Sequence, residues 1–325
     1  MFISYYLPDD VRQNADLMNR FDFDEAFLDE KIGVRTRHIA SSTQGTSDLC
    51  VEAARILERE AEGYDPQAVD TVLLCTQSGD FKLPHTSAIL QSALKLPRQA
   101  ACFDLNLGCS GFVYGLSVIK GLLSTGTSRN GLFFTCDPYS KVLDPEDRNT
   151  VLLFGDAAAV TWIRAEDLDG GFRIGAFDLG TNGEHFESLI VRSGGVRNPL
   201  SPESNDETWS GNTYAMDGRD VYQYMVRCVP ASVKKCLEKN GKLFEEIDFF
   251  LFHQASGHML NTIQKLLRIP DEKMVRAFSD VGNTVSSTIP IGLKKLEAEH
   301  DLEGKSVLLC GFGVGLSWGT VVVEL

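Results

Sequence analysis

Two long stretches of the sequence resemble each other, and this internal repeat limits the possible folds more than any other feature. Residues 58–122 and residues 238–296 each leave a helix, enter an apolar segment that begins with Asp and ends with Gln, and continue through a second helix that ends in a Leu-Pro or Ile-Pro pair. Each stretch then passes through a strand into a turn that starts another helix. Self-similarity at a long period is typical of duplicated architectures, so we expect two copies of one α/β unit.

The repeat places two residues at equivalent points. Cys109 follows Pro97 of the first copy by 12 residues, and Asn283 follows Pro270 of the second copy by 13. Both lie where a strand gives way to a helix, and His253 ends an apolar strand of the second copy. Because ligand sites of α/β sheets lie beyond the carboxyl ends of the strands, we expect the two turns to face each other and to form one site with His253.

The alternation of strands and helices along the chain indicates the α/β class. We divide the 325 residues into an N-terminal half, 1–169, which carries Cys109, and a C-terminal half, 170–325, which carries His253 and Asn283. The expected elements are helices over 46–61, 87–94, 112–123 and 216–239, strands over 70–77, 99–107 and 131–136, and a long loop over 193–217.

Charge and composition narrow the class of protein. The net charge of −14 argues against a general nucleic-acid-binding surface, which needs a basic face. No apolar run reaches the roughly 18 residues of a membrane span, and the first residues lack the basic and small-residue pattern of a signal peptide. We therefore expect a cytoplasmic protein in which the eight cysteines, none of them in a CxxC pair, stay free thiols. Because no His, Cys and carboxylate cluster has the spacing of a metal site, we expect no bound metal.

The residue types at the expected site are suited to acyl transfer. A thiolate at the start of a helix is stabilised by the peptide dipoles and by free backbone N–H groups, so we expect the pKa of Cys109 to be lowered. A thiolate attacks a thioester readily and gives another thioester. The His253 imidazole and the Asn283 amide are neutral donors that can hold a carbonyl oxygen on which negative charge develops. The glycine-rich segment 311–319, which we expect to be a loop, adds backbone N–H groups opposite Cys109.

In combination, these segments resemble the β-ketoacyl-acyl-carrier-protein synthase III family of thiolase-fold condensing enzymes. The resemblance covers nearly the whole chain and rests on the segments 6–8, 33–40, 104–112, 144–148, 154–157, 253–255, 282–284 and 311–319. It implies a thiolase-like five-layer αβαβα fold of two duplicated halves and a homodimer. It also implies that no cofactor is bound permanently and that coenzyme A (CoA) thioesters are substrates.

The resemblance implies a decarboxylative Claisen condensation in two steps. Cys109 takes an acyl group from an acyl-CoA primer. His253 and Asn283 then promote the decarboxylation of a malonyl thioester, for which an acyl carrier protein is the expected carrier. The resulting carbanion attacks the acyl-cysteine and gives a 3-oxoacyl thioester, while the backbone N–H groups of Cys109 and Gly313 form the oxyanion hole.

The resemblance also assigns contacts to CoA and to a second subunit. Phe27 and Arg148 match positions that hold the CoA adenine, and Lys31 and Arg35 lie nearby. Taken alone, the basic segment 35–39 is equally compatible with a solvated loop and with a phosphate contact. Leu83 matches a residue that reaches the acyl site across the dimer.

Several positions depart from the family pattern. Ser256 replaces an Asn, His258 replaces an Arg that helps to dock the acidic carrier protein, and Phe27 replaces a Trp. Lys265 and Arg268, further along the same expected helix, offer an alternative basic contact. These departures leave the chemistry in place and point to a specialised synthase III-like enzyme.

Three other functions compete with this hypothesis. A synthase III-like acyltransferase would move the acyl group from Cys109 to an alcohol or amine without decarboxylation, and it would not need Asn283 as a donor. A degradative thiolase needs a second cysteine inside the C-terminal glycine-rich segment, whereas Cys310 precedes that segment. An inactive binding homologue is disfavoured because the Cys, His and Asn are all present. The condensing enzyme is therefore our first choice.

Overall fold

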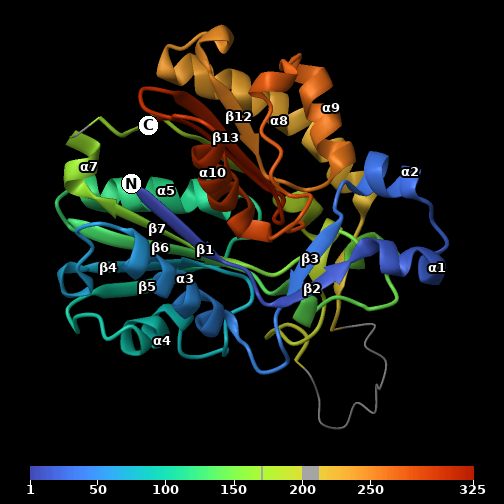
Figure 1. The fold of residues 1–325 in the computed structure, drawn as a ribbon, viewed down its shortest axis with the longest axis horizontal. Coiled ribbons are helices and arrows are strands. Elements are labelled where there is room, and N and C mark those ends of the chain that lie inside the picture. The colour runs from blue at the N-terminus through green and yellow to red at the C-terminus, as the bar shows by residue number, and fades with distance from the viewer. Residues whose placement is uncertain (170, 200–211) are drawn as a thin grey trace.

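The computed structural model describes residues 1–169, 171–199 and 212–325, and two large β-sheets are stacked between layers of helices (Figure 1). The first sheet has the strand order β1-β7-β6-β4-β5. The second has the order β12-β13-β14-β8, with β9 also paired to β14. The strands of the first sheet are β1 (Phe2–Tyr6), β4 (Thr71–Cys75), β5 (Ala101–Leu105), β6 (Asn130–Cys136) and β7 (Ala158–Arg164). Those of the second are β8 (Arg173–Ile174), β9 (Asp178–Thr181), β12 (Phe249–Phe252), β13 (Ser306–Gly313) and β14 (Ser317–Glu324).

The two sheets repeat one topology, which confirms the predicted duplication. In the first sheet β4 runs parallel to β5 and to β6, and β6 is antiparallel to β7. In the second sheet β12 runs parallel to β13, and β13 is antiparallel to β14. The counterpart of β5 is reduced to a single parallel bridge between Phe250 and Met274. The strand expected after Pro270 is therefore much shorter than its equivalent after Pro97.

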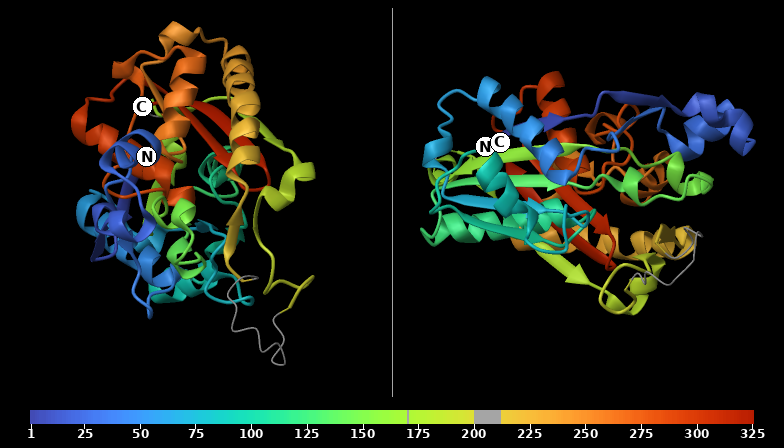
Figure 2. Two further views of the ribbon diagram at one scale, coloured as in Figure 1. Left: turned by 90° about the vertical axis from the view of Figure 1, so that its right-hand side faces the viewer. Right: turned by 90° about the horizontal axis from the view of Figure 1, so that it is seen from below.

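Helices fill three layers, one between the sheets and one on each outer face (Figures 1 and 2). The central layer holds α5 (Gly111–Ser124) and α10 (Thr288–Glu299), whose side chains share one apolar core with both sheets. The outer layers hold α3 (Thr46–Glu60) and α4 (Thr86–Ala93) against the first sheet, and α8 (Gly218–Asn240) and α9 (Gly257–Leu267) against the second. The predicted five-layer αβαβα fold is confirmed.

Helix α5 lies in the centre because its sequence is apolar on almost every side. A helix of this composition has no face for water and is stable only when it is covered all round. Gly115 lets it approach β6 closely, since an added Cβ would lie 2.0 Å from the Phe133 ring. This helix starts at Gly111, two residues after Cys109, so the packing of α5 also fixes the position of that cysteine.

Most elements agree with the sequence predictions, and the differences have local causes. The helix expected from 216 begins at Gly218, because the Asp217 side chain accepts hydrogen bonds from two backbone N–H groups and caps it. The glycine-rich segment 311–319, expected as a loop, is the β13–β14 hairpin. In the expected loop 193–217, residues 200–211 lie outside the described residues and β11 lies at the far end.

The smaller elements are β2 (Asp10–Gln13), β3 (Thr36–Ile39), β10 (Leu189–Val191), β11 (Tyr214–Met216), α1 (Met18–Phe21), α2 (Glu25–Phe27), α6 (Arg148–Val151) and α7 (Ala165–Asp169).

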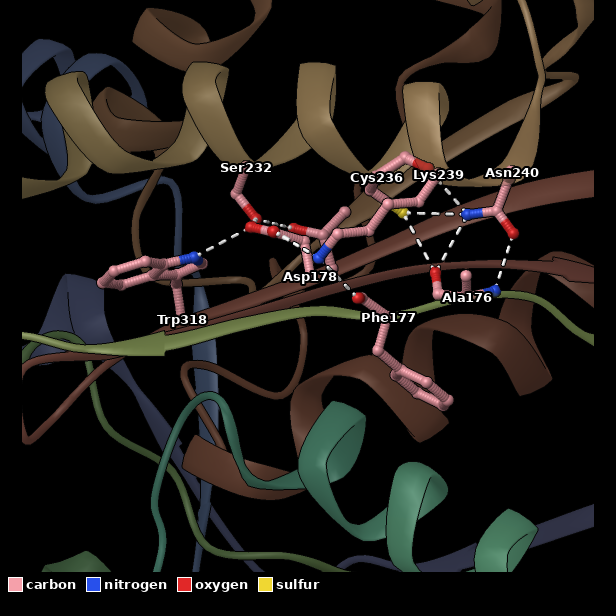
Figure 3. A network of polar contacts seen from close by, with 9 residues as sticks. Ala176, Phe177, Asp178, Ser232, Cys236, Lys239, Asn240 and Trp318 are labelled. Carbon is pink, nitrogen blue, oxygen red and sulfur yellow. Dashed lines mark hydrogen bonds and ion pairs between the residues drawn. The ribbon is translucent and has the colours of Figure 1, made fainter.

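A polar network joins the outer helix α8 to the second sheet (Figure 3). The Asp178 carboxylate on β9 accepts hydrogen bonds from the Ser232 hydroxyl and the Trp318 indole N–H, and it forms an ion pair with Lys239 at 2.9 Å. Asn240, at the end of α8, bonds the backbone just before β9. Because Trp318 belongs to β14, this network holds the β13–β14 hairpin against α8.

The two ends of the chain lie side by side (Figure 2), and Met1 and Leu325 line the same small cavity. Within the three described ranges, no helix combines the length and the apolar character needed to cross a bilayer. The same ranges contain no group of three or more His, Cys, Asp or Glu side chains arranged to hold a metal ion.

Candidate active site

Cys109 lies in the turn between β5 and α5, and two glycines make the close packing of this turn possible. An added Cβ on Gly108 would lie 2.5 Å from the Gln77 side chain, and one on Gly111 would lie 2.1 Å from the Cys75 sulfur. A hydrogen bond from the Gly111 N–H to the Gly108 carbonyl closes the turn. The Cys109 side chain is thereby held directly before the N-terminus of α5, where it is 8% exposed.

The C-terminal hairpin covers this turn. A Cβ added at Gly313 would lie 2.9 Å from the Cys109 sulfur, and one at Gly311 would lie 2.7 Å from the Cys109 carbonyl oxygen, so glycine is needed for the strand to approach so closely. The hydroxyls of Ser110 and Ser317 lie 2.7 Å apart and join the turn to the hairpin. The structure thus places the glycine-rich segment opposite Cys109.

His253 directly follows β12, and its ring is fixed from several sides. Its backbone N–H donates to the Cys310 carbonyl, and its ring meets the Phe312 ring edge to face. The Nδ1 atom lies 2.8 Å from the Thr288 hydroxyl. The Gln254 side chain holds the next turn by bonding backbone groups of two neighbouring segments. Burial lowers the pKa of His253 to about 3, so the imidazole is neutral.

Asn283 follows Gly282, whose φ of +76° favours glycine. The backbone N–H and carbonyl of Asn283 both pair with the segment 153–155, which ties the Asn283 turn to the first half of the chain. In the side chain, Oδ1 accepts from the Val285 N–H at 2.9 Å, and this identifies the oxygen of the amide. The NH2 group is therefore turned the other way, toward the Ala255 carbonyl at 3.4 Å and the cavity that Asn283 lines.

All four residues expected to take part in catalysis line one cavity of about 600 Å³. Cys109 comes from the first copy of the repeat, whereas His253, Asn283 and Gly313 come from the second part of the chain. Cys109 and His253 lie beyond the carboxyl ends of β5 and β12, and Gly313 ends β13, so these three residues lie at the edge that the repeat indicated. Most of the remaining wall is apolar; it includes Ile32, Leu153, Phe154, Leu189, Met216, Val221 and Met259.

The residues expected to contact CoA are only partly gathered at this cavity. Phe27 and Lys31 line it. Arg148 lies over the Phe27 ring, with its guanidinium carbon 5.1 Å from the ring centroid. Arg35 lies apart from the lining and forms ion pairs with two acidic neighbours at 2.7 and 3.6 Å. The structure therefore brings three of the four residues together.

The pKa of the Cys109 thiol differs from the value that the sequence predicted. Burial raises the pKa of its thiol to about 12, and the nearby Asp137 carboxylate acts in the same direction. A hydrogen bond from the Val314 backbone opposes both effects. The predicted lowering of the pKa is wrong, because the loss of water around the sulfur outweighs the stabilisation that the start of α5 offers a thiolate.

The raised pKa has a measurable consequence. Because the thiolate is the reactive form and its fraction grows with pH, alkylation of Cys109 by iodoacetamide should accelerate about tenfold per pH unit from about pH 6 to about pH 9. A pKa lowered by the helix would instead give a plateau within this range. The time course is measured by intact-mass spectrometry, with Cys109→Ala as the control for other thiols. A plateau below about pH 8 would contradict the raised pKa.

Sequence reasoning missed the buried Asp137, which follows β6 and lies between two loops of the site. Its carboxylate accepts hydrogen bonds from the Gln77 backbone N–H at 2.7 Å and from the Ser286 hydroxyl. Burial raises the pKa of Asp137 to about 7, although these hydrogen bonds oppose the shift. The residue ties the loop after β4 to the loop that carries Asn283. Its place at the carboxyl end of a buried strand is the signal that could have revealed it.

A second missed feature is an aromatic partition beside Cys109, formed by Tyr139, Phe154 and Tyr214. Their ring centroids lie 5.2 to 5.4 Å apart, and the Tyr139 hydroxyl donates to the Gln77 side chain at 2.8 Å. Tyr214 lines both the catalytic cavity and a second cavity of about 870 Å³, which Tyr139 also lines. The aromatic partition therefore lies between the two cavities. No local pattern marks it, because its members come from separate segments of the chain.

Two family models match the chain. The model described as 3-oxoacyl-[acyl-carrier-protein (ACP)] synthase III matches residues 103–183, and the model described as the C-terminal part of this synthase matches residues 237–325. The matched regions contain Cys109, His253 and Asn283.

Known proteins extend the similarity to the whole chain. A β-ketoacyl-[acyl-carrier-protein] synthase III of Lactococcus lactis subsp. cremoris is 33% identical over 99% of this chain and 97% of its own. A crystal structure of a 3-oxoacyl-(acyl-carrier-protein) synthase III shares 39% identity with a TM-score of 0.93, over 100% of this chain and 98% of the other. The priming β-ketosynthase of the R1128 polyketide pathway shares 27% identity with a TM-score of 0.86, over 99% of this chain and 94% of its own. On this full-length similarity, the chain belongs to the β-ketoacyl-[acyl-carrier-protein] synthase III family.

Proposed function

We propose that this chain condenses an acyl-CoA primer with a malonyl thioester, with loss of CO2, and that Cys109 carries the acyl group. The observation that carries this proposal is the convergence of Cys109, His253 and Asn283 on one cavity. In this proposal the half 1–169 supplies the nucleophile and the half 170–325 supplies the two donors. The reaction class agrees with the family to which the chain belongs.

In the first step, the Cys109 sulfur attacks the thioester carbonyl of the acyl-CoA. A new S–C bond forms, the bond to the CoA sulfur breaks, and the proton of the Cys109 thiol leaves with CoA as its thiol. The backbone N–H groups of Cys109 and Gly313 hold the oxyanion of the tetrahedral intermediate. The close approach of Gly313 to the Cys109 sulfur supports this assignment.

In the second step, the carbonyl oxygen of the malonyl thioester lies between the His253 Nε2 atom and the Asn283 NH2 group. Loss of CO2 puts negative charge on this oxygen, and the two donors stabilise it. The carbanion attacks the acyl carbon on Cys109, the 3-oxoacyl thioester forms, and the sulfur leaves as a thiolate that takes up a proton. A neutral His253 suits the role of hydrogen-bond donor in this step.

The residues at the mouth of the cavity support two carriers: CoA for the acyl primer and an acyl carrier protein for the malonyl group. Phe27, Lys31 and Arg148 gather there, and we assign the CoA contacts to them. On α9, His258 stacks on Tyr222 at the mouth, with ring centroids 5.4 Å apart. Two exposed cations follow His258, Lys265 on the same helix and Arg268 just after its end, and they offer contacts to an acidic acyl carrier protein. We retain no CoA contact for Arg35, which is paired with acidic neighbours.

The described surface also supports a homodimer. β5 is an edge strand of its sheet, so one row of its backbone groups is available to a second copy. The nearby loop exposes two large apolar side chains, Phe81 at 65% and Leu83 at 86%. Apolar groups of this size on a loop next to an open sheet edge are typical of a surface that a partner covers.

The acyltransferase alternative lacks a supporting observation. An acyltransferase needs the Cys109 nucleophile and its oxyanion hole. A condensing enzyme needs them too, so these groups do not distinguish the two functions. Only the condensation also uses an amide donor at the cavity, and the Asn283 NH2 group is turned toward the cavity. The orientation of Asn283 therefore favours condensation.

The aromatic partition leads us to propose a short primer. A short acyl group on Cys109 fits on the catalytic side of Tyr139 and Tyr214, whereas a long chain would have to displace them. We expect wild-type protein to form the acyl-enzyme with acetyl-CoA and butyryl-CoA, and to react with octanoyl-CoA at least about tenfold more slowly. Tyr214→Ala should raise the octanoyl rate because it joins the two cavities. The measurement is the time course of acyl adducts by intact-mass spectrometry.

Tyr139→Phe is the matched control for this experiment, since it removes a hydroxyl and leaves the ring of the aromatic partition in place. It should keep the preference of the wild type for short acyl groups. Equal acylation of wild-type protein by acetyl-CoA and octanoyl-CoA would contradict a short primer, and would leave the assignment of Cys109 intact.

A further inference from the structure

Val285 has a backbone conformation that a β-branched residue rarely adopts. Its φ is +53°, in the left-handed region, where the Cβ of an L-residue lies too close to the following carbonyl oxygen. Among the described residues, the other non-glycine residues with a positive φ are all exposed and lie at the ends of helices; they are Asp22, Lys95 and Arg268. Val285, in contrast, is fully buried and follows Asn283 by two residues. Strain of this kind persists only where the surroundings hold it in place.

The same turn carries a second cost. The Thr284 hydroxyl is fully buried and makes no hydrogen bond with any residue that the structure describes. A buried hydroxyl without a partner costs free energy, because it has given up its hydrogen bonds to water. The two residues that follow Asn283 are therefore both unfavourable by themselves, and the turn depends on its contacts.

Contacts on two sides keep the turn in this conformation. The backbone N–H and carbonyl of Asn283 are paired with the segment 153–155. The Val285 side chain packs in the apolar cluster that includes Cys109 and the aromatic partition. One of its methyl groups lies 3.4 Å from the point that a Cβ on Gly108 would occupy. The strained residue is thus packed between the Asn283 turn and the Cys109 turn.

The conformation of Val285 directs its N–H toward the Asn283 side chain. This N–H donates to the Asn283 Oδ1 atom at 2.9 Å, as in an Asx turn. The chain after Val285 is fixed, since its carbonyl accepts the N–H of Thr288 at the start of α10. A negative φ at Val285 would therefore rotate the peptide plane that carries the N–H, and the hydrogen bond to Oδ1 would be lost. Without this bond, the Asn283 amide is no longer held with its NH2 group toward the cavity.

We propose that Val285 is a positioning residue whose left-handed backbone holds the Asn283 amide in the orientation that catalysis needs. The side chain of Val285 stabilises this conformation by its packing beside the Cys109 turn, and the backbone N–H acts on Asn283. The consequence for catalysis rests on the proposed function. A donor stabilises a developing oxyanion best when it is held in place before the charge develops.

Glycine and alanine at position 285 separate a backbone role from a side-chain role. Glycine adopts a positive φ without a steric penalty, whereas alanine keeps the penalty and loses most of the packing that offsets it. We expect Val285→Ala to release CO2 from a malonyl thioester at least about tenfold more slowly than the wild type, because a small misplacement of a catalytic group lowers the rate strongly. Val285→Gly should release CO2 faster than Val285→Ala, and both should keep the wild-type rate of Cys109 acylation.

A role in packing alone predicts the reverse order, because glycine removes more of the buried side chain than alanine does. Release by Val285→Gly that is no faster than release by Val285→Ala would overturn the proposal. So would a Val285→Ala variant in which acylation and CO2 release fall by the same factor, or one that releases CO2 like the wild type.

Thr284→Val is the matched control in the same turn. It replaces the hydroxyl by a methyl group of similar size and leaves Val285 unchanged. Because the hydroxyl makes no hydrogen bond with the described residues, this variant should unfold at the same temperature as the wild type or at a higher one, and should release CO2 at the wild-type rate. Slow release by Thr284→Val would refute a specific role of Val285, since any change in the turn would then have the same effect.

Crystal structures give a readout that does not depend on the reaction. The Asn283 Oδ1 atom should accept the N–H of residue 285 in the wild type and in Val285→Gly, and should lose this contact in Val285→Ala. A wild-type structure with Val285 at a negative φ would contradict the proposal even if neither variant folds. If the wild type releases no CO2, the proposed condensation fails, whereas the contact of Asn283 in these structures still supports or overturns the role of Val285.

Discussion

Cys109→Ala is expected to abolish the acyl-enzyme. Incubation of the wild type with an accepted acyl-CoA should increase the mass of the protein by one acyl group, and the variant should show no increase. The reason is chemical: among the described residues that line the cavity Cys109 is the only cysteine, and we propose it as the nucleophile, with His253 and Asn283 as donors. Loss of the thiol therefore removes the site of the covalent bond, and condensation should fall to background with it.

Cys310→Ala is the matched control. Cys310 is fully buried and lies on β13, three residues before Gly313, but its sulfur accepts a hydrogen bond from the Thr320 hydroxyl at 3.2 Å and does not line the cavity. This variant should be acylated like the wild type. An acyl adduct that survives in Cys109→Ala would sink the assignment of the nucleophile. Loss of acylation in Cys310→Ala as well as in Cys109→Ala would point to the degradative thiolase, which needs a second cysteine.

The fold could be predicted because the information lay in a repeat. The matched apolar segments, the Leu-Pro and Ile-Pro pairs and the two turns depend only on local sequence, and duplication then determines how two such units are arranged. The repeat also identified Cys109 and Asn283 as equivalent, and the structure brings both to one cavity. The site residues that were found this way all lie at a strand end or a helix start, where position along the chain and position in space are closely related.

Features that depend on surroundings could not be predicted in the same way. The pKa of Cys109 is set by burial and by Asp137, a residue 28 positions away whose proximity appears only after folding. Arg37 belongs to the basic segment for which a solvated loop and a phosphate contact were equally open. It is 4% exposed and donates to the Asn14 side chain at 2.7 Å, so neither interpretation holds for it. Burial of a charged side chain in a polar network leaves no mark in a single sequence.

The aromatic partition and the Thr288 hydroxyl are further examples. Tyr139 and Tyr214 are 75 residues apart in sequence, and each alone reads as an ordinary core aromatic. Thr288 lies five residues after Asn283, and its contact with His253 depends on how the start of α10 packs against the His253 ring. The space beside Cys109 and the contacts of the His253 ring thus depend on packing between distant segments, which a periodic pattern does not report.

Asn283→Ala is expected to lose CO2 release while it keeps acylation of Cys109. Removal of one preorganised donor to a developing oxyanion costs about 10²- to 10³-fold in rate. The first half-reaction should be unchanged, because we propose that its oxyanion is held by the backbone N–H groups of Cys109 and Gly313 and not by the Asn283 amide. The measurement follows labelled CO2 from a malonyl thioester labelled at its free carboxylate, with intact-mass spectrometry of the acyl-enzyme in parallel.

Asn283→Asp distinguishes the loss of the NH2 donor from a structural effect of the substitution. Asn283 Oδ1 accepts the Val285 N–H at 2.9 Å, and alanine loses this contact together with the donor. Aspartate keeps an oxygen for the Val285 N–H but replaces the NH2 group by an acceptor, so it should preserve the turn and still fail to promote loss of CO2. If both variants release CO2 as fast as the wild type, the amide does not stabilise the oxyanion, and a transfer of the acyl group to an alcohol or amine becomes the better explanation of the site. If both retain acylation and lose CO2 release, the second donor is what separates a condensing enzyme from such an acyltransferase.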